Sequence, residues 1–123
     1  MNSEVIIKSA KSISEYIEFV EQFNADKSCE IYFRGEPDDY GETAFQPSVY
    51  RKNYLKNEHR IYREMQRFND YEFASDRTSF DRISRMQHFL TPSRLIDLSE
   101  DALTSLYFAV SERKLNQKAI VYA

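Results

Sequence analysis

The 123-residue chain carries 17 Lys and Arg against 20 Asp and Glu, a net charge of −3, and 41% of its residues are hydrophobic. This length suits one domain, the apolar content excludes a chain disordered by composition, and the charge argues against general nucleic-acid binding. With only two Gly and three Pro, a β-sandwich or barrel with many turns is disfavoured, so we expect helices joined by a few strands.

The first third of the chain predicts a strand, a helix and a second strand. Residues 4–8 form a short β-prone run. Apolar side chains at helical spacing over residues 13–23 predict an amphipathic helix. Residues 29–34 are rich in β-forming side chains with little alternation, which is typical of a strand buried on both faces. Gly35 and Pro37 are expected to end this strand.

The rest of the chain predicts three helices and two strands. Helices are expected over about residues 53–68 and 79–89, and Pro92 stops the second of them. Residues 93–98 predict a strand, and residues 119–122 predict another that stops at the chain end. A terminal strand with nothing after it indicates either a minimal domain or the N-terminal part of a longer protein.

A third helix is expected between these two strands, after the capping segment Ser99-Glu100-Asp101. The residues expected to face inward are Leu103, Leu106, Tyr107, Phe108 and Val110. The element order β-α-β-α-α-β-α-β predicts an α+β fold, in which residues 1–123 form one domain with about four helices packed on a small mixed sheet.

Several kinds of site are absent from the sequence. Cys29 is the single cysteine, so no internal disulfide forms, and His59 and His88 alone make no metal site. No phosphate-binding loop, dinucleotide-binding glycine motif or Gly-flanked nucleophilic serine is present. The N-terminus lacks signal-peptide features and no run approaches the ~18 apolar residues of a membrane span, so we expect a soluble cytoplasmic protein.

Two arginines and two acids are candidates for a site. Arg34 and Asp97 each end a predicted strand, a position that often lines the mouth of a cleft. The arginine fork suits bidentate contact with a carboxylate or a phosphate. Two interpretations stay open: Arg34 and Arg94 contact a ligand, or they pair internally with Asp97 or Glu58 and hold the fold.

Two further features carry both a functional and a structural interpretation. His88 follows Gln87 at a predicted helix end, where an imidazole either shuttles a proton or caps the helix. Basic residues recur between Arg51 and Arg67 and form either a local nucleic-acid-binding patch or a solvated helix face.

Several short motifs follow one another along the chain. They are Tyr32-Phe33-Arg34-Gly35, Gln46-Pro47-Ser48-Val49-Tyr50-Arg51, Glu58, Gln87-His88, Ser93-Arg94-Leu95-Ile96-Asp97-Leu98-Ser99 and Leu106-Tyr107-Phe108-Ala109. Over about residues 30–122 this order resembles the FRG-domain family of bacteria and phages, named after a Phe-Arg-Gly strand end. The resemblance implies a module of uncharacterised activity, found near defence or toxin systems.

The layout is also similar to part of the ADP-ribosyltransferase fold. That similarity implies NAD as a cofactor, contacted by Arg34, with residues 97–99 ending a second strand and a helix over 102–110 behind it. In that fold a later strand supplies a catalytic Glu, and this chain ends at Ala123 before one appears. We therefore expect weak or no NAD binding and no transfer by this polypeptide alone.

Three functional hypotheses follow. In the first, the chain is an FRG module, non-catalytic or partial, that binds an unidentified ligand or protein partner in a polar cleft, with no metal and no membrane contact. The second is an NAD-dependent ADP-ribosyltransferase-like enzyme. The third is a nucleic-acid-acting toxin or defence protein that uses residues 51–67, although the net charge disfavours nucleic acid. The candidate ligand-binding residues are Arg34, Glu58, Gln87, His88, Arg94, Asp97 and Ser99.

Overall fold

The computed structural model describes residues 5–24 and 29–123, in which four α-helices and two short strands form. The helices are α1 (Ile13–Asn24), α2 (Glu58–Phe68), α3 (Ser79–His88) and α4 (Ala102–Ser111), and the strands are β1 (Arg34–Glu36) and β2 (Ile120–Tyr122). The α+β class with four helices is confirmed. The sheet differs from the expectation, because its two strands pair antiparallel rather than in a mixed arrangement.

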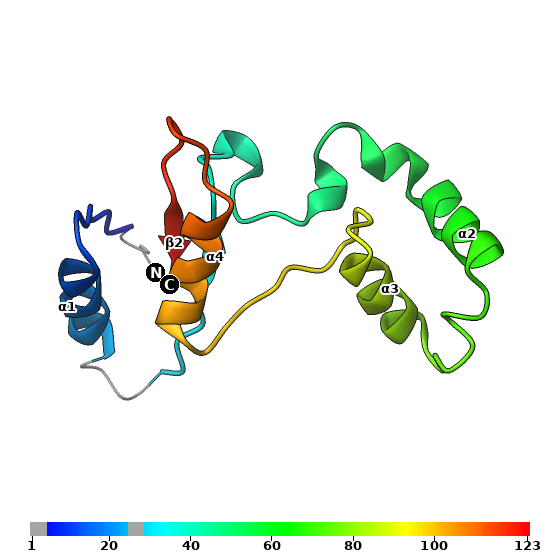
Figure 1. The fold of residues 1–123 in the computed structure, drawn as a ribbon, viewed down its shortest axis with the longest axis horizontal. Helices are drawn as coiled ribbons and strands as arrows, with labels where there is room; N and C mark the ends of the chain where they lie inside the picture. Colours follow the sequence, from blue (N-terminus) through cyan, green and yellow to red (C-terminus); the bar gives the residue numbers. More distant parts are fainter. Residues whose placement is uncertain (1–4, 25–28) are drawn as a thin grey trace.

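The molecule is elongated and has two parts (Figure 1). The sheet part holds α1, α4 and both strands, and the helical part holds α2 and α3. Residues 44–47 and 94–101 cross between the two parts. The segments that contain these crossings meet where the backbone amide of Val49 donates to the carbonyl of Ser93 at 3.2 Å. Val49 is fully buried at this junction.

Gly35, in the middle of β1, allows α4 to pack directly onto the sheet. A Cβ atom at Gly35 would lie 1.9 Å from the carbonyl oxygen of Ser105 and 2.9 Å from the backbone nitrogen of Ala109. Both Ser105 and Ala109 are buried. The close approach therefore requires a glycine in β1 and small side chains on the facing side of α4.

The predicted inward face of α4 is wrong for four of its five residues. Leu103 and Val110 are 49% and 48% exposed, and Tyr107 and Phe108 are 65% and 57% exposed. The physical reason is the close contact with β1, which only small side chains can occupy. The large apolar side chains of α4 are displaced to its other sides as a consequence.

Three predicted strands do not form where expected. Residues 5–8 have no regular structure, and Glu4 lies outside the described residues. The strand expected over residues 29–34 is displaced to β1, so that Gly35 lies inside it, and Phe33 pairs with Ser99 in an isolated bridge. Residues 93–98 form no strand. β-prone runs become strands only where a neighbouring strand accepts their hydrogen bonds.

The predicted helices agree more closely with the structure. The expectations for residues 13–23 and 79–89 are confirmed by α1 and α3, and β2 confirms the terminal strand. The single helix expected over residues 53–68 is divided into a 3-10 helix (Tyr54–Asn57) and α2. Asn53, before the 3-10 helix, has the left-handed φ of 60°, so the helical backbone cannot extend further back.

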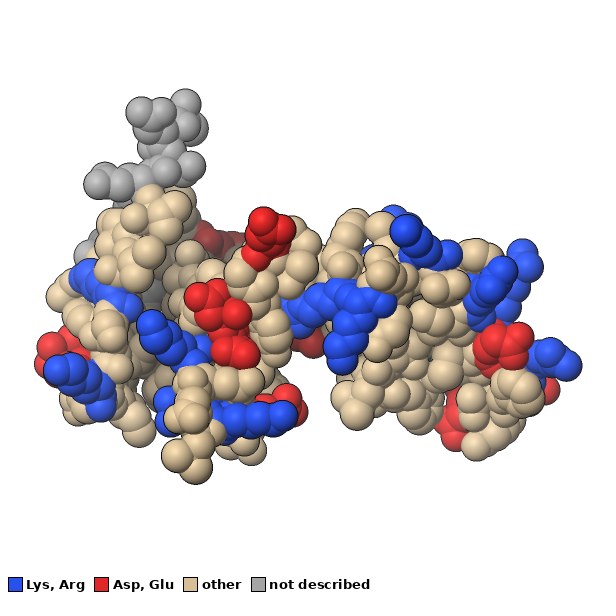
Figure 2. Space-filling model, turned by 90° about the horizontal axis from the view of Figure 1, so that it is seen from above, with Lys and Arg blue, Asp and Glu red and all other residues tan. Residues whose placement is uncertain are grey.

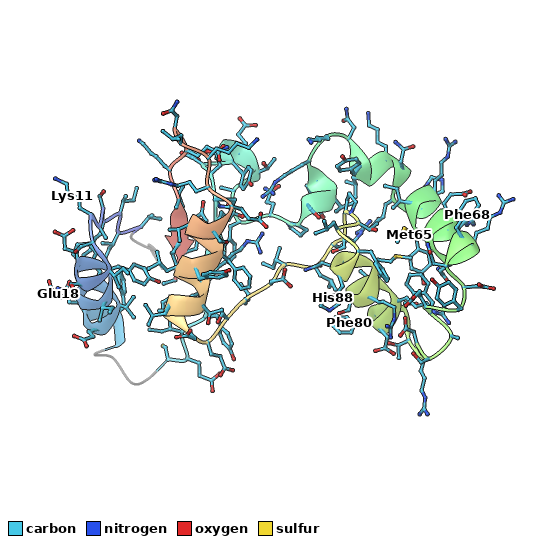
Figure 3. All side chains as sticks on the ribbon, in the orientation of Figure 1. Lys11, Glu18, Met65, Phe68, Phe80 and His88 are labelled. Carbon is cyan, nitrogen blue, oxygen red and sulfur yellow. The ribbon has the colours of Figure 1, made fainter. Side chains whose placement is uncertain are left out.

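The chain leaves much apolar surface in solvent. Phe68 and Phe80 are exposed, at the outer end of α2 and in the first turn of α3 (Figure 3). The hydrophobic residues buried in the described part are Phe33, Val49, Phe73, Met86 and Ala109. The accessible surface is 9993 Å², whereas a compact monomer of this mass exposes ~6,900 Å². Packing within the chain therefore buries only part of its apolar surface.

The turn between α2 and α3 is ordered around Asp76. Its carboxylate accepts hydrogen bonds from the Arg85 Nε and Nη2 atoms at 2.7 to 3.0 Å, and its side chain is nearly buried. These bonds lower the pKa of the Asp76 carboxyl. Thr78 and Asp81 begin α3 with a reciprocal capping box. The turn is therefore held by one ion pair and one helix cap.

Replacing Gly35 by alanine tests the packing of α4 on β1. Because the new methyl group would meet backbone atoms that cannot rotate away, Gly35→Ala is expected to cost about 3 kcal/mol of unfolding free energy or more. Gly41→Ala is the matched control, since nothing lies within 4 Å of its Cβ position and only its φ of 53° is strained. The control should cost about 1–2 kcal/mol. Chemical denaturation measures both, and equal costs would contradict the contact.

Replacing Asp76 by asparagine tests the ion pair through its pH dependence. Because the pKa of Asp76 is lowered in the folded state, the stability that the pair contributes is complete above the ordinary Asp value of about 3.9 and disappears as the pH falls through the lower folded value. Melting temperatures should therefore differ between the wild type and Asp76→Asn at pH 7 and converge below about pH 4. A difference that stays constant to pH 2 would argue against the ion pair.

Candidate functional site

Gln87, in the last turn of α3, connects two of the sequence motifs by its side-chain amide. Its Nε2 atom donates to both carboxylate oxygens of Asp97, at 2.7 and 2.8 Å. Its Oε1 atom accepts a hydrogen bond of 2.6 Å from the hydroxyl of Ser93, which is buried. The amide thereby fixes the irregular segment of residues 93–97 to the end of α3.

The same network reaches the motifs in the first half of the chain. The backbone amide of Ser93 donates to the hydroxyl of Ser48 at 3.1 Å. Arg34 Nη1 donates to the backbone carbonyl of Asp97 at 3.2 Å. Residues of the Phe-Arg-Gly, Pro-Ser, Gln-His and Arg-Leu-Ile-Asp segments thus share one hydrogen-bond network, although the first and last lie about sixty positions apart in the sequence.

The carboxylate partner of Arg34 is Glu36, which sequence reasoning missed. Arg34 Nε donates to Glu36 Oε1 at 3.0 Å, and the Glu36 side chain is only 1% exposed. The expected proximity of the Arg34 guanidinium to Asp97 is found, but the contact is with the backbone carbonyl of Asp97, and the carboxylate that pairs with Arg34 is that of Glu36. A signal was present in the sequence, since residues two apart in a strand point to the same face.

The buried Glu36 carboxylate also organises the loop after β1. It accepts hydrogen bonds from the backbone amide of Phe45 at 3.2 and 3.3 Å and from Arg51 Nη2 at 3.5 Å. The Arg51 guanidinium lies over the ring of Tyr40, 3.8 Å from its centre. Burial and the nearby Glu36 raise the pKa of Tyr122 on β2. This cluster is enclosed by its own partners and holds the fold together.

Arg94 and Glu58 form the second arginine-carboxylate pair. Arg94 Nε lies 2.7 and 2.9 Å from the two Glu58 oxygens, and Nη2 lies 2.7 Å from Oε2. These bonds lower the pKa of Glu58 and raise that of Arg94. The internal pairing of Arg94 with Glu58 is confirmed, and the Arg94 side chain is nevertheless 58% exposed.

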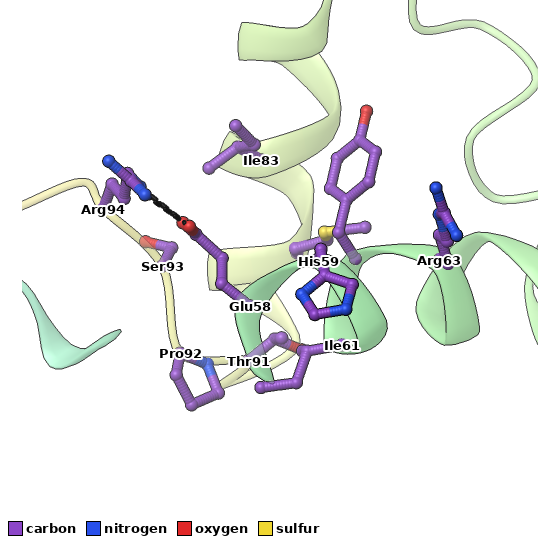
Figure 4. A pocket seen from close by; sticks show the side chains of 11 residues that line it. Glu58, His59, Ile61, Arg63, Ile83, Thr91, Pro92, Ser93 and Arg94 are labelled. Carbon is purple, nitrogen blue, oxygen red and sulfur yellow. Dashed lines mark hydrogen bonds and ion pairs between the residues drawn. The ribbon is translucent and has the colours of Figure 1, made fainter. Parts of the chain in front are cut away.

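The ion pair lies at the rim of a pocket of about 500 Å³ between α2, α3 and residues 91–94 (Figure 4). Most of the wall surface is apolar, although seven of the eleven lining residues carry a polar or charged group. The lining residues are Glu58, His59, Ile61, Tyr62, Arg63, Ile83, Met86, Thr91, Pro92, Ser93 and Arg94. Of the seven residues predicted for a cleft, only Glu58 and Arg94 line this pocket. His59 and Arg63, which sequence reasoning did not assign to it, lie one helical turn apart on α2.

The remaining predicted site residues lie elsewhere. His88 ends α3 (Figure 3), is exposed, and is not among the residues that line the pocket. Ser99 pairs with Phe33 in the isolated bridge, and its hydroxyl accepts a hydrogen bond from the backbone amide of Asp101. The described residues bring no three His, Cys, Asp or Glu side chains together in a way that could hold a metal ion.

The family is decided by a match that covers most of the chain. The sequence model of the FRG domain matches residues 29–118. The chain belongs to the FRG-domain family. Comparisons of this FRG domain with curated proteins and with solved structures gave no match. The similarity to ADP-ribosyltransferases therefore gains no support, and the second strand that it requires, at residues 93–98, is not formed.

The basic residues of the FRG domain between Arg51 and Arg67 differ in their surroundings. Arg51 is turned inward to Glu36, Thr43 and Tyr40, and Arg67 lies near Glu64. On the face seen in Figure 2, basic side chains over the helical part have acidic ones between them. In the part of the chain that the structure describes, no helix is both long and apolar enough to cross a membrane.

A double-mutant cycle tests the Gln87–Asp97 bonds. Because one amide donates to both oxygens of a partly solvated carboxylate, Gln87→Ala and Asp97→Ala should be coupled by about 1 kcal/mol in unfolding free energy. Gln87→Ala combined with Asp101→Ala is the control, which should be additive, because Asp101 caps α4 and does not touch Gln87. Equal coupling in both cycles would mean that the network does not exist in solution.

Proposed function

We propose that this FRG domain is a binding module whose pocket between α2 and α3 takes a small ligand with an apolar body and an anionic group. The observation that carries the proposal is the open pocket itself. Its volume of about 500 Å³ falls within the range of small-molecule sites, which extends over roughly 300–1,000 Å³. Apolar walls with a few polar groups at the rim are typical of such sites.

The apolar body of the ligand would lie against the inner wall. Ile61 and Tyr62 come from α2, Ile83 and Met86 from α3, and Pro92 from the segment that follows. Met86 is buried and therefore forms the floor rather than the rim. Removing apolar ligand surface from water at this wall would supply the main part of the binding free energy.

The charges at the rim favour an anion. Glu58 is the one acidic residue among those that line the pocket, and Arg94 already neutralises it with three hydrogen bonds. Arg63 and His59 remain to face a ligand from α2. Arg94 is half exposed at the rim, so its outward N–H groups can bind a carboxylate or phosphate beside Glu58.

Arg94 would contact the ligand, whereas the other motif residues would act by holding the pocket wall in place. Ser93 lies in the pocket wall and is held by Gln87 and Ser48. Asp97 and Arg34 fix the other end of the same segment. A site held by such surrounding hydrogen bonds binds without first having to be ordered, which lowers the free-energy cost of binding.

Phenyl phosphate and benzyl alcohol, as charged and neutral probes, test the proposal by NMR of the isoleucine methyl groups. We expect phenyl phosphate to shift the signals of Ile61 and Ile83. Arg94→Gln should weaken phenyl phosphate binding about tenfold, the value of a charge-assisted hydrogen bond, and leave benzyl alcohol nearly unaffected.

Ile83→Arg fills the pocket and should abolish both sets of shifts, whereas Ile13→Arg, the same change on exposed α1, should leave them intact. Unchanged binding in Ile83→Arg, or shifts spread over all isoleucines, would contradict the pocket. Should Ile83→Arg fail to fold, Arg94→Gln at the rim still distinguishes the two probes.

The enzyme hypothesis keeps its own test, in which NAD replaces the probes. Arg34 is engaged by Glu36 and by the Asp97 carbonyl, and it does not line the pocket. Release of nicotinamide that is lost in Arg34→Ala would move the ADP-ribosyltransferase hypothesis to first place. The cytoplasmic location, the bacterial or phage origin and the role in defence or toxin systems follow from the sequence and the family resemblance, and they stay predictions.

A further inference from the structure

Helix α4 has an outer apolar face that the described chain leaves about half exposed. None of its ten residues is charged. Ser105 and Ala109 are buried against β1, and Leu103, Tyr107 and Val110 lie on the opposite side at the helical spacing of four and three. These three residues, called here the outer face of α4, are 49%, 65% and 48% exposed. An uncharged helix with an apolar residue on every side is typical of a buried helix.

The amount of exposed surface is large enough for a stable interface. The chain exposes 9993 Å², about 3,000 Å² more than the ~6,900 Å² of a compact monomer of its mass. A permanent dimer removes roughly 1,000–2,500 Å² from each partner. This excess is spread over the whole elongated chain, and covering the outer face of α4 and its surroundings would remove part of it.

The charges that flank α4 indicate what covers it. Glu100 and Asp101 precede the helix, and Glu112, Arg113 and Lys114 follow it, all five exposed, so that the net charge is negative before the helix and positive after it. Tyr107 lies near the middle of this arrangement: Leu103 is four positions before it and Val110 three after it, while Glu100 is seven before and Arg113 six after. The apolar residues and the charges are thus placed almost symmetrically about Tyr107, with opposite net charge at the two ends of α4.

We propose that the outer face of α4 is a self-association surface, on which a second copy of this chain packs its own α4 antiparallel. A two-fold axis near Tyr107 places Tyr107 against its counterpart and Leu103 against Val110 of the other copy. It also brings Glu100 of each copy to Arg113 of the other, and the two helix dipoles oppose each other favourably. An antiparallel pair is the arrangement that matches opposite charges, because a parallel pair would place Glu100 beside Glu100.

A charged partner surface fits this face less well. Charges pressed against Leu103, Tyr107 and Val110 would lose water without gaining an opposite charge. Among the described helices, α1, α2 and α3 all carry charged residues on their surfaces, and α4 is the one without them. The proposal concerns the sheet part alone and does not depend on the ligand pocket in the helical part.

Light scattering coupled to size-exclusion chromatography tests the proposal. We expect the wild type to have twice the monomer mass of 14.7 kDa at high micromolar concentration. Tyr107→Glu should weaken dimerisation about tenfold or more, since a residue on the two-fold axis acts in both copies. Tyr71→Glu is the matched control, because Tyr71 is similarly exposed, at 72%, in the turn after α2. The control should remain a dimer.

A charge exchange tests the antiparallel register. Glu100→Arg should weaken the dimer, and adding Arg113→Glu to the same chain should restore it, whereas a parallel or unrelated interface would not respond in this way. Thermal melts should show both variants folded, because the two side chains are exposed. A monomeric wild type, an unaffected Tyr107→Glu variant, or a failure of the exchange to restore dimerisation would overturn the proposal.

Discussion

The side-chain amide of Gln87 is the contact on which the arrangement of the motif segments depends. It is the point at which the end of α3, the buried Ser93 and the carboxylate of Asp97 meet. Residues 93–97 have no strand or helix to hold them, so their course is fixed by these side-chain bonds and by Ser48. An amide suits this place, because it donates to Asp97 with one end and accepts from Ser93 with the other. A carboxylate at position 87 would repel Asp97.

Arg34 and Arg94, the two arginines that the sequence indicated, each pair with a carboxylate, and the two pairs have different roles. Arg34 meets a buried Glu36 and joins β1 to the segment ahead of α4. Arg94 meets Glu58 at the open rim of a pocket. The depth of the acid decides the difference, since a buried carboxylate needs its partners to remain charged, while a partly solvated pair can exchange partners with a ligand.

The sequence predicts local structure better than it predicts contacts between elements that are distant in the sequence. The apolar periodicity gives α1 and α3 nearly residue by residue, because a helix satisfies its own backbone hydrogen bonds. Residues 93–98 look like a strand and form none, since a strand depends on a partner that propensity does not reveal. The prediction of which side chains of α4 face inward was wrong for a similar reason. The residue that determines which side of α4 packs on the sheet is Gly35, and it lies on another element. The sequence indicated Asp97 or Glu58 as the partner of Arg94, and Glu58 is the one that pairs with it. The pocket could not be predicted in the same way, because it forms only where α2 and α3 lie together.

The position of the motif residues bears on where specificity resides in this domain. Gln87 and Arg34 both bind Asp97 and lie outside the pocket, whereas Ser93 and Arg94 of the same segment line it. The groups that would distinguish one ligand from another, His59, Arg63 and Tyr62, lie on α2 outside the motif segments. On the proposed function, the motif segments would hold the frame of the pocket and supply Arg94, and the other groups that distinguish ligands would come from α2. Exchanging residues of α2 should therefore change what is bound without changing the fold, and exchanging Gln87 should do the reverse.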